Sequence, residues 1–300
     1  MYLKSFEQLI ETLKCNDKKK VAVVAAEDEH ALESVFKARN EGIVEPILIG
    51  NEEKIREISN KLNEDLKDLT IINIEEPKEA AVKAVELARE GKVQVIMKGK
   101  IQTADLLRAV VNKEKGLGTG RIMSHMAMHE LPNYHKLLAV TDGGMMMYPN
   151  VQEKKQIIEN AVDIFKAIGY TKPKVGILAA VENVNTKMPE TVDADNLKQM
   201  NINGEITDCL IEGPISYDLV MSKESAEIKG YKSEVVADAD ILVVPNITTG
   251  NILGKSLVYS AEAKMAGFII GAKVPIVLTS RGSTAEEKYL SLVLSASASK

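Results

Sequence analysis

The sequence is poor in aromatic residues, which make up 4% of its 300 residues and include no Trp. The hydrophobic core must therefore be aliphatic, built mainly from Val, Ile, Leu, Ala and Met. The chain also has only two cysteines, Cys15 and Cys209, which lie far apart and show no metal-type spacing. Free thiols in a reducing compartment are the simplest interpretation, so we expect a cytoplasmic protein.

Long apolar runs and basic clusters are scarce as well. No stretch approaches the ~18 consecutive apolar residues of a membrane span, and the start, MYLKSFEQLIETLK, predicts an amphipathic helix rather than a signal peptide. The net charge is -5, and the one basic run, Lys18 to Lys20, directly precedes an apolar run. Because nucleic-acid binding usually needs a basic surface, we expect neither a nucleic-acid partner nor a membrane partner.

Short aliphatic runs alternate with amphipathic segments along most of the chain. This alternation predicts an α/β fold, in which mostly parallel sheets are covered by helices. The expected strands are 21–26, 46–50, 70–74, 93–99, 174–180, 206–213, 239–246, 267–271 and 275–280. The expected helices are 30–39, one from residue 52, 77–89, 103–112, 151–168 and 285–297.

The pattern changes in the middle of the chain. Residues 121–130 and 136–142 are two strand-like runs joined by a turn signal, which predicts a hairpin, and the Gly/Pro/Asn-rich segment 141–150 is the expected crossing between lobes. A chain of this length exceeds the usual size of a single core. We therefore predict two α/β lobes, with the functional site in a cleft between them.

Three strand-to-helix junctions are candidates for anion binding, because helix N-termini present unpaired N–H groups. At the first, a strand ends in Lys98 and Gly99, and a helix begins near Thr103. The alternative is an ordinary turn in which Thr103 is the N-cap and Arg108 pairs with Asp105.

The second junction carries Thr249, Gly250 and Asn251 between a strand and a helix. Its composition suits close approach of a ligand to the backbone. An ordinary strand-to-helix turn uses the same residues, so this junction alone decides little.

At the third junction a strand delivers Ser280 and Arg281 to its tip. Arginine suits bidentate recognition of phosphate. Just beyond, Ser283 with Glu286 and Thr284 with Glu287 each fit a helix capping box, and only one of the two pairs can form it. One glutamate is therefore left for other work, and the sequence does not say which.

With these junctions in view, the chain resembles the phosphate acetyl/butyryltransferase family, most closely its phosphate butyryltransferase branch. The matching motifs are MKGKIQTADLLRAV, TGRIMSH, TDGGMMMYP, KMPETVDA, EGPISYD, VVPNITTGN and LTSRGS. The resemblance implies two lobes of the isocitrate/isopropylmalate dehydrogenase type, an active site in the cleft, and dimers as the basic unit. It also implies a discontinuous first lobe, residues 1–140 plus 272–300, and a second lobe, residues 141–271.

The implied reaction is the interconversion of acyl-CoA plus phosphate with acyl phosphate plus CoA. The branch favours butyryl-CoA, with acetyl-CoA as the alternative. By resemblance, Ser280 contacts the CoA sulfur and the carbonyl oxygen, Arg281 holds phosphate, and Glu287 is the base for the thiol. The acetyltransferases tend to have Asp at that position and the butyryl branch favours Glu one residue earlier, so Glu286 stays open as the base.

Further residues enter through the same motifs. Arg108 matches an arginine that pairs with CoA phosphate, and Ser124 and His125 lie in a matching segment. The alternative for His125 is a strand histidine whose ring is satisfied by its neighbours. Met145 to Met147 fit either an acyl pocket or plain packing. We expect CoA as a substrate, no tightly bound cofactor and no metal, because arginine and helix N-termini can neutralise phosphate.

Two other function classes remain. A dehydrogenase of the same fold would oxidise a 2-hydroxy acid with NAD and depend on a divalent metal. A non-catalytic protein binding acyl-CoA or phosphate would keep the anion sites, although the Glu286/Glu287 pair argues mildly against it. The expected partners are CoA or acyl-CoA, phosphate or acyl phosphate, and a second copy of the chain in a homodimer or higher homo-oligomer.

Overall fold

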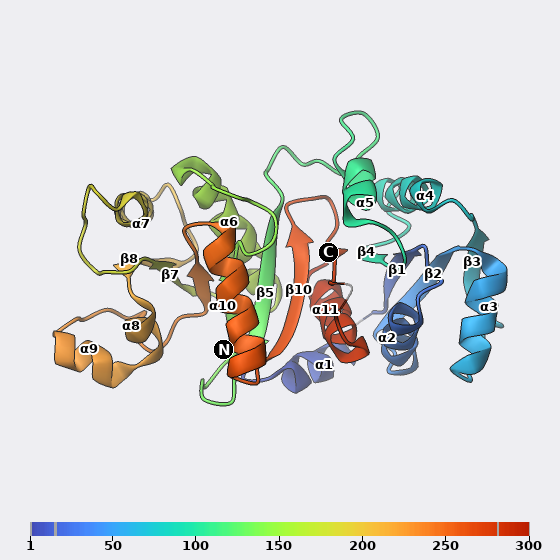
Figure 1. Cartoon of the computed structure of the whole chain (residues 1–300), viewed down its shortest axis with the longest axis horizontal. Helices are drawn as coiled ribbons and strands as arrows, with labels where there is room; N and C mark the ends of the chain where they lie inside the picture. Colours follow the sequence, from blue (N-terminus) through green and yellow to red (C-terminus); the bar gives the residue numbers. More distant parts are fainter. Residues whose placement is uncertain (1, 15–16, 281, 300) are drawn as a thin grey trace. The chain divides into compact units, whose positions relative to one another are not determined.

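The computed structural model describes residues 2–14, 17–280 and 282–299, which form two compact units (Figure 1). The N-terminal unit consists of Glu7–Arg121 together with the chain from Ala266 onward, and the middle unit consists of Ile122–Met265 together with the chain start as far as Phe6. The crossing predicted at 141–150 is not there, because this segment lies wholly within the middle unit. The predicted boundaries after residues 140 and 271 move to Arg121 and Met265.

The N-terminal unit is built on a sheet with the strand order β3-β2-β1-β4-β11-β10. Strands β1 to β4 run parallel to one another, β11 runs parallel to β4, and β10 runs antiparallel to β11. The strands are β1 (Lys19–Val24), β2 (Val44–Gly50), β3 (Thr70–Asn73), β4 (Val95–Lys98), β10 (Lys264–Ile270) and β11 (Ile276–Val277). The predicted parallel sheet is confirmed here.

The helices of this unit begin where the sequence offers good caps. Helix α4 has Glu76 as its N-cap and Pro77 in its first turn, where the missing N–H of proline costs nothing. Helix α11 buries nine consecutive residues from Lys288 to Ala296 and packs against α2. The helices are α1 (Phe6–Lys14), α2 (Glu29–Asn40), α3 (Glu52–Lys61), α4 (Pro77–Arg89), α5 (Thr103–Val110) and α11 (Ala285–Ala298).

The middle unit has the strand order β5-β6-β9-β7-β8. Strands β5 and β6 form the predicted antiparallel hairpin, and β6, β9, β7 and β8 run parallel. The strands are β5 (Ser124–Glu130), β6 (Leu138–Thr141), β7 (Lys174–Leu178), β8 (Leu210–Ile215) and β9 (Ile241–Val243). The helices are α6 (Val151–Ala167), α7 (Pro189–Ile202), α8 (Tyr217–Met221), α9 (Lys223–Lys229) and α10 (Ile247–Ser260).

Helices α7, α8 and α9 were not predicted. In α7 only Thr191, Ala194 and Leu197 are buried, so the apolar repeat that signals an amphipathic helix is weak. Helices α8 and α9 are single turns or little more. None of the three therefore has an apolar repeat long and regular enough to predict a helix from the sequence.

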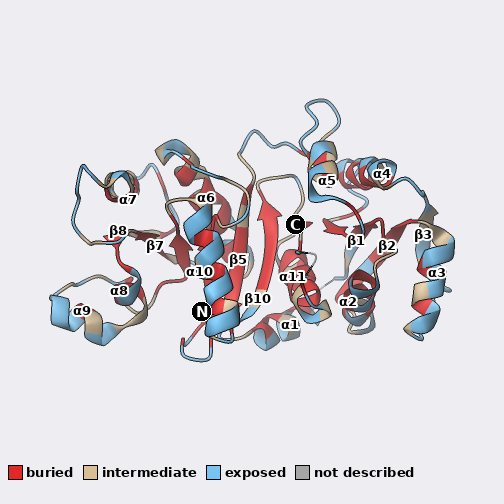
Figure 2. Cartoon of the chain, in the orientation of Figure 1, coloured by how far each residue is buried: buried red, intermediate tan, exposed pale blue. Residues whose placement is uncertain are grey.

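Each unit has an aliphatic core around its sheet, as the composition predicts. In β1, the residues Val21 to Val24 are fully buried, which is typical of a parallel strand covered on both faces. Figure 2 shows the strands mainly in the colour of buried residues, while helices such as α2 and α10 carry a buried side and an exposed side. No helix among the described residues is long and apolar enough to cross a membrane.

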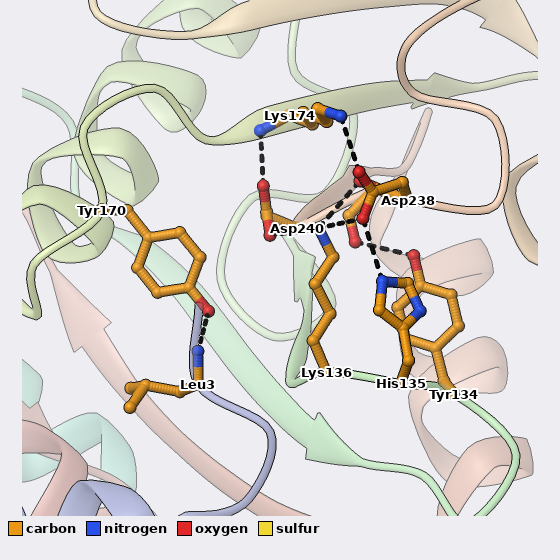
Figure 3. Close-up of polar contacts among 9 residues, drawn as sticks. Leu3, Tyr134, His135, Lys136, Tyr170, Lys174, Asp238 and Asp240 are labelled. Carbon is orange, nitrogen blue, oxygen red and sulfur yellow. Dashed lines mark hydrogen bonds and ion pairs between the residues drawn. The ribbon is translucent and has the colours of Figure 1, made fainter. Parts of the chain in front are cut away.

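A partly buried ion-pair network lies at the start of the parallel strands in the middle unit (Figure 3). The Lys136 ammonium lies 2.8 Å from an Asp238 carboxylate oxygen and 2.7 Å from one of Asp240, and the Lys174 ammonium donates to Asp238 at 2.6 Å. Burial raises the pKa of Asp238, but hydrogen bonds from Lys136 and Lys174 outweigh it and lower the pKa to about 2. Lys136 and Asp240 are almost fully buried, so each depends on the other's charge.

Candidate functional site

The first and third predicted junctions come together in the N-terminal unit. Strands β4 and β11 are parallel neighbours, with Ile276 opposite Ile96 and Val277 opposite Met97. Their carboxyl ends therefore meet at one edge of the sheet, where parallel-sheet proteins gather ligands. We call the residues at this edge the strand-end site: Lys98, Gly99, Thr279, Ser280, Ser283, Glu287 and Lys288.

Gly99 is required by its neighbouring strand. A Cβ at this position would lie 2.3 Å from the Ala25 carbonyl oxygen, which is too close for any side chain. The backbone N–H of Lys100 donates to that same oxygen at 2.7 Å. Glycine is therefore explained by the close approach of β1, a reason that the sequence did not reveal. Beside it, the buried Lys98 ammonium donates to the Gly99 carbonyl at 3.2 Å.

The segment after β11 folds back on itself around Ser280. The Ser280 hydroxyl oxygen accepts from the Gly282 N–H at 3.3 Å, and its carbonyl accepts from the Ser283 N–H at 3.1 Å. Ser283 in turn donates its hydroxyl to the Glu287 carboxylate at 2.7 Å. The exposed Ser280 is thus carried by a short turn whose far end is tied to Glu287.

The structure decides the capping register of α11. Thr284 is the N-cap, and its hydroxyl oxygen accepts from the Glu287 N–H at 3.1 Å. The Thr284/Glu287 spacing is therefore the one used, although the Glu287 carboxylate binds Ser283 rather than the N-cap N–H. Glu286 occupies the same first turn and is exposed. Arg281, the predicted phosphate ligand, lies outside the described residues.

Lys288 follows Glu287 on α11 and was not predicted. Its ammonium donates to the Thr279 hydroxyl oxygen at 3.1 Å, one residue before Ser280. The side chain is 5% exposed, which is rare for a lysine. In the sequence, Lys288 is a single lysine within an otherwise mainly apolar helical face, and this was the only signal of its role. Its contact with the end of β11 becomes visible only in the structure.

The start of α5 confirms the predicted helix start near Thr103, but it differs from the alternative interpretation in its cap. The N-cap is Gln102, which makes no side-chain capping bond, and Thr103 is the first helical residue, so Thr103 is not the cap. Arg108 forms the predicted ion pair, with its guanidinium 2.6 Å from the Asp105 carboxylate. The Arg108 side chain is 70% exposed, so it can reach a solvent-borne ligand at little cost.

In the middle unit, a buried aspartate organises the turn after β6. The Asp142 carboxylate accepts from the backbone N–H groups of His125 at 2.9 Å, Gly144 at 2.8 Å and Met145 at 2.7 Å. The sequence interpretation treated this segment as a linker and missed Asp142. A signal was present, because aspartate before glycines commonly bonds the backbone two residues on.

The second predicted junction is not a loop. Thr249, Gly250 and Asn251 lie in the first turns of α10, which is capped by Asn246 through the Thr249 N–H at 3.0 Å. Gly250 packs directly on Gly143: a Cβ added to Gly250 would lie 2.7 Å from the Gly143 Cα. The glycine that suggested close approach of a ligand to the backbone is explained here by a close contact with the backbone of Gly143.

Ser124 and His125 start β5 in the same unit. The Ser124 hydroxyl is fully buried and accepts from the Asn160 amide at 3.1 Å. Among the described residues, His125 Nδ1 is buried without a hydrogen-bond partner. The alternative of a satisfied histidine is therefore wrong for His125. Burial lowers the pKa of His125, although the charge of Asp142 works in the opposite direction.

The chemistry available at the strand-end site is specific. A hydroxyl, two buried ammonium groups and a carboxylate lie at the carboxyl ends of adjacent strands, which suits binding of an anion and movement of one proton. No group of three His, Cys, Asp or Glu side chains that could hold a metal is present among the residues described.

Such a site on an α/β scaffold is typical of enzymes that handle phosphorylated or otherwise anionic substrates. A profile of the phosphate acetyl/butaryl transferase family matches residues 5–82 and 75–296. The chain therefore belongs to the phosphate acetyl/butaryl transferase family.

Individual relatives agree along nearly the whole length. The chain is 43% identical over 294 residues to a phosphate butyryltransferase of Clostridium acetobutylicum, covering 98% of each chain. It is 41% identical over 290 residues to a phosphate acetyltransferase of Thermotoga maritima, covering 97% of this chain and 98% of the relative. A branched-chain phosphotransacylase structure from Enterococcus faecalis V583 superposes with a TM-score of 0.82 at 34% identity, covering 93% of this chain and 98% of that one.

Proposed function

We propose that this enzyme transfers a short acyl group between coenzyme A and inorganic phosphate. The family match along almost the entire chain is the observation that carries the proposal. In one direction the CoA thiolate attacks the carbonyl carbon of an acyl phosphate, the C–O bond to phosphate breaks, and acyl-CoA and phosphate leave. In the reverse direction a phosphate oxygen attacks the thioester and the thiolate departs.

Within this reaction we assign Ser280 to the reacting carbonyl and sulfur, and Arg281 to the phosphate. The thiol must lose a proton before it attacks, because only the thiolate is strongly nucleophilic. Glu287 is the proposed acceptor of that proton. The hydrogen bond from Ser283 supports this choice over Glu286, because it ties the Glu287 carboxylate to the turn that carries Ser280.

The remaining predicted residues would bind the rest of the substrates. Lys98, Gly99 and Thr103 would approach phosphate groups, and Arg108 would pair with a phosphate of CoA. Ser124, His125, Thr249, Gly250 and Asn251 are proposed substrate-binding positions of the middle unit. CoA enters as a substrate, and we propose that no tightly bound cofactor or metal is needed.

Butyryl-CoA is the favoured acyl donor, with acetyl-CoA as the alternative. The identities to a butyryltransferase and to an acetyltransferase, 43% and 41%, are too close to separate the two. The isocitrate/isopropylmalate dehydrogenase-like arrangement, a cytoplasmic location and a homodimer also stay predictions. Light scattering of the purified protein in solution would measure whether it forms a homodimer.

The test is consumption of free thiol when purified protein receives CoA with butyryl phosphate or acetyl phosphate, without added metal. Faster turnover with butyryl phosphate would support both the reaction and the branch. If folded protein turns over neither acyl phosphate, the proposal fails and a binding protein becomes the better interpretation. Turnover of a 2-hydroxy acid with NAD and a divalent metal would instead favour a dehydrogenase.

The base is tested by two matched variants. Glu287→Gln should lower kcat by about 100-fold or more, in the range typical of a lost general base, with little change in CoA affinity. Glu286→Gln, in the same helical turn, should retain most of the activity. The reverse ranking would make Glu286 the base and leave Glu287 as a residue that holds the turn.

A further inference from the structure

Lys288 is a buried cation with little to compensate its charge. Its ammonium has three N–H donors, and among the described residues it has one acceptor, the Thr279 hydroxyl oxygen at 3.1 Å. No carboxylate of the residues that the structure describes lies within 4.0 Å of the Lys288 ammonium. An ammonium this deeply buried without an anion is strongly unfavourable.

Two other buried lysines in the same molecule, Lys136 and Lys154, are paired with carboxylates. Lys136 has two aspartates, and Lys154 lies 2.6 Å from the Asp193 carboxylate. At both of these positions the fold supplies a counter-charge for the buried ammonium. Lys288 departs from this pattern at the one helix that carries the proposed base.

The place of Lys288 in the chain puts it at the strand-end site. Its partner Thr279 is 9% exposed and directly precedes Ser280, while Glu287, the residue before Lys288, binds Ser283 on the other side of the same turn. Lys98, a second buried lysine, ends the adjacent parallel strand. An anion bound at this edge would supply the counter-charge that Lys288 lacks.

We propose that Lys288 binds the phosphate group of the substrate, as inorganic phosphate in one direction and as the phosphoryl group of the acyl phosphate in the other. The inference rests on the proposed function and adds a residue to it. It also gives neighbouring residues of α11 separate tasks: Glu287 takes the proton of the thiol, and Lys288 neutralises the phosphate that forms or departs.

The experiment compares Lys288→Met with Lys288→Arg and with Lys273→Met. Lys273 is an exposed lysine in the turn before β11, so its replacement controls for loss of one positive charge. We expect Lys288→Met to raise the KM for phosphate at least about tenfold, the cost expected for losing a hydrogen bond to a charged group. The KM for CoA should change less than about threefold, and Lys288→Arg should recover part of the phosphate affinity.

A second readout is independent of turnover. Inorganic phosphate should raise the melting temperature of the wild-type enzyme, because a ligand that binds only the folded state stabilises it. The rise should be lost in Lys288→Met and kept in Lys273→Met. Without phosphate, Lys288→Met should melt no lower than the wild type, since an uncompensated buried charge has been removed.

Thr279→Val tests the opposing interpretation, in which Lys288 only stabilises the end of β11 through its hydrogen bond to Thr279. Loss of phosphate affinity in Thr279→Val as large as in Lys288→Met would overturn the inference, and so would an unchanged phosphate KM and melting shift in Lys288→Met. If Lys288→Met does not fold, Lys288→Arg becomes the deciding variant. A complete loss of the phosphate-dependent rise in melting temperature in Lys288→Arg would also contradict the inference that Lys288 binds phosphate. A wild-type melting shift that is lost in Lys288→Met, in an enzyme without turnover, would support Lys288 as the phosphate ligand and refute the proposed reaction.

Discussion

The contact between α10 and the turn after β6 makes a sharp prediction about two glycines in one helix. Gly250 and Gly254 are both buried and helical, so replacing either with alanine should gain up to about 1 kcal/mol of helix propensity. Their surroundings differ. A Cβ at Gly250 would lie 2.7 Å from the Gly143 Cα and 2.9 Å from the Asp142 carbonyl oxygen, whereas a Cβ at Gly254 would have His129 Nε2 at 3.7 Å as its nearest neighbour.

The magnitudes follow from these distances. At Gly250 the new methyl meets backbone atoms that cannot rotate away, and overpacking of this kind costs about 1–3 kcal/mol or more, which exceeds the propensity gain. At Gly254 the contact is an ordinary one, so most of the gain should survive. We expect Gly250→Ala to lower the free energy of unfolding by about 1–2 kcal/mol, and Gly254→Ala to raise it by up to about 1 kcal/mol.

Urea denaturation followed by far-ultraviolet circular dichroism would measure both variants. The informative quantity is the difference between them, because the two substitutions share the same chemistry and the same helix. If Gly250→Ala proved as stable as Gly254→Ala, the close contact with Gly143 would not constrain the fold, and the reasoning from backbone distance would be refuted. A loss in both would instead contradict the space inferred beside His129.

Three further predictions concern charges. Burial lowers the pKa of His129 from 6.5 to about 4, so the unfolded chain binds this proton at a higher pH than the folded chain does. The free energy of unfolding should therefore fall by about 3 kcal/mol in total as pH drops from 6.5 to about 4. Urea midpoints measured across this pH range should show the fall, and His129→Leu should lack the part that comes from His129. Lys136→Met should lower the free energy of unfolding by about 3–5 kcal/mol, because Asp240 is left buried without its cation, and a loss below 1 kcal/mol would show that the site admits water. Arg108→Ala should change the free energy of unfolding by less than about 0.5 kcal/mol, since the ion pair of Arg108 with Asp105 is exposed. A higher KM for CoA at unchanged stability would identify Arg108 as a CoA-binding residue. An unchanged KM would show that Arg108 does not bind CoA.

Much of the fold could be predicted because parallel strands and their helices leave strong local patterns. Strands β1, β2 and β4 each contain a short, mainly aliphatic run that is largely buried. The helix over Pro77–Arg89 was predicted with the observed bounds. The unit boundaries were placed differently because a Gly-rich segment resembles a linker. In the structure those glycines allow Asp142 and α10 to approach the backbone, which is a tertiary requirement with no local signature.

The candidate site was predictable to the extent that its residues follow strands. Ser280 and Lys98 were found because strand-end positions are visible in the sequence, and their adjacency follows from the pairing of β4 with β11. Lys288 was missed because it lies inside a helix whose other buried residues are mainly apolar, so only its burial and its contact with Thr279 reveal it. The capping box was ambiguous because two serine/threonine–glutamate pairs overlap by one residue, and only the geometry at Thr284 separates them.

The order of the chain has a consequence for synthesis on the ribosome. The middle unit, apart from a few residues made at the outset, is translated in one stretch, and it is complete once Met265 has emerged. The N-terminal unit must wait, because β4 stays without its partner β11, and α2 without α11, until the last part of the chain appears. Domains generally fold as units during translation, so the half of the enzyme that is made first is expected to finish folding last, with a sheet edge open in the interval.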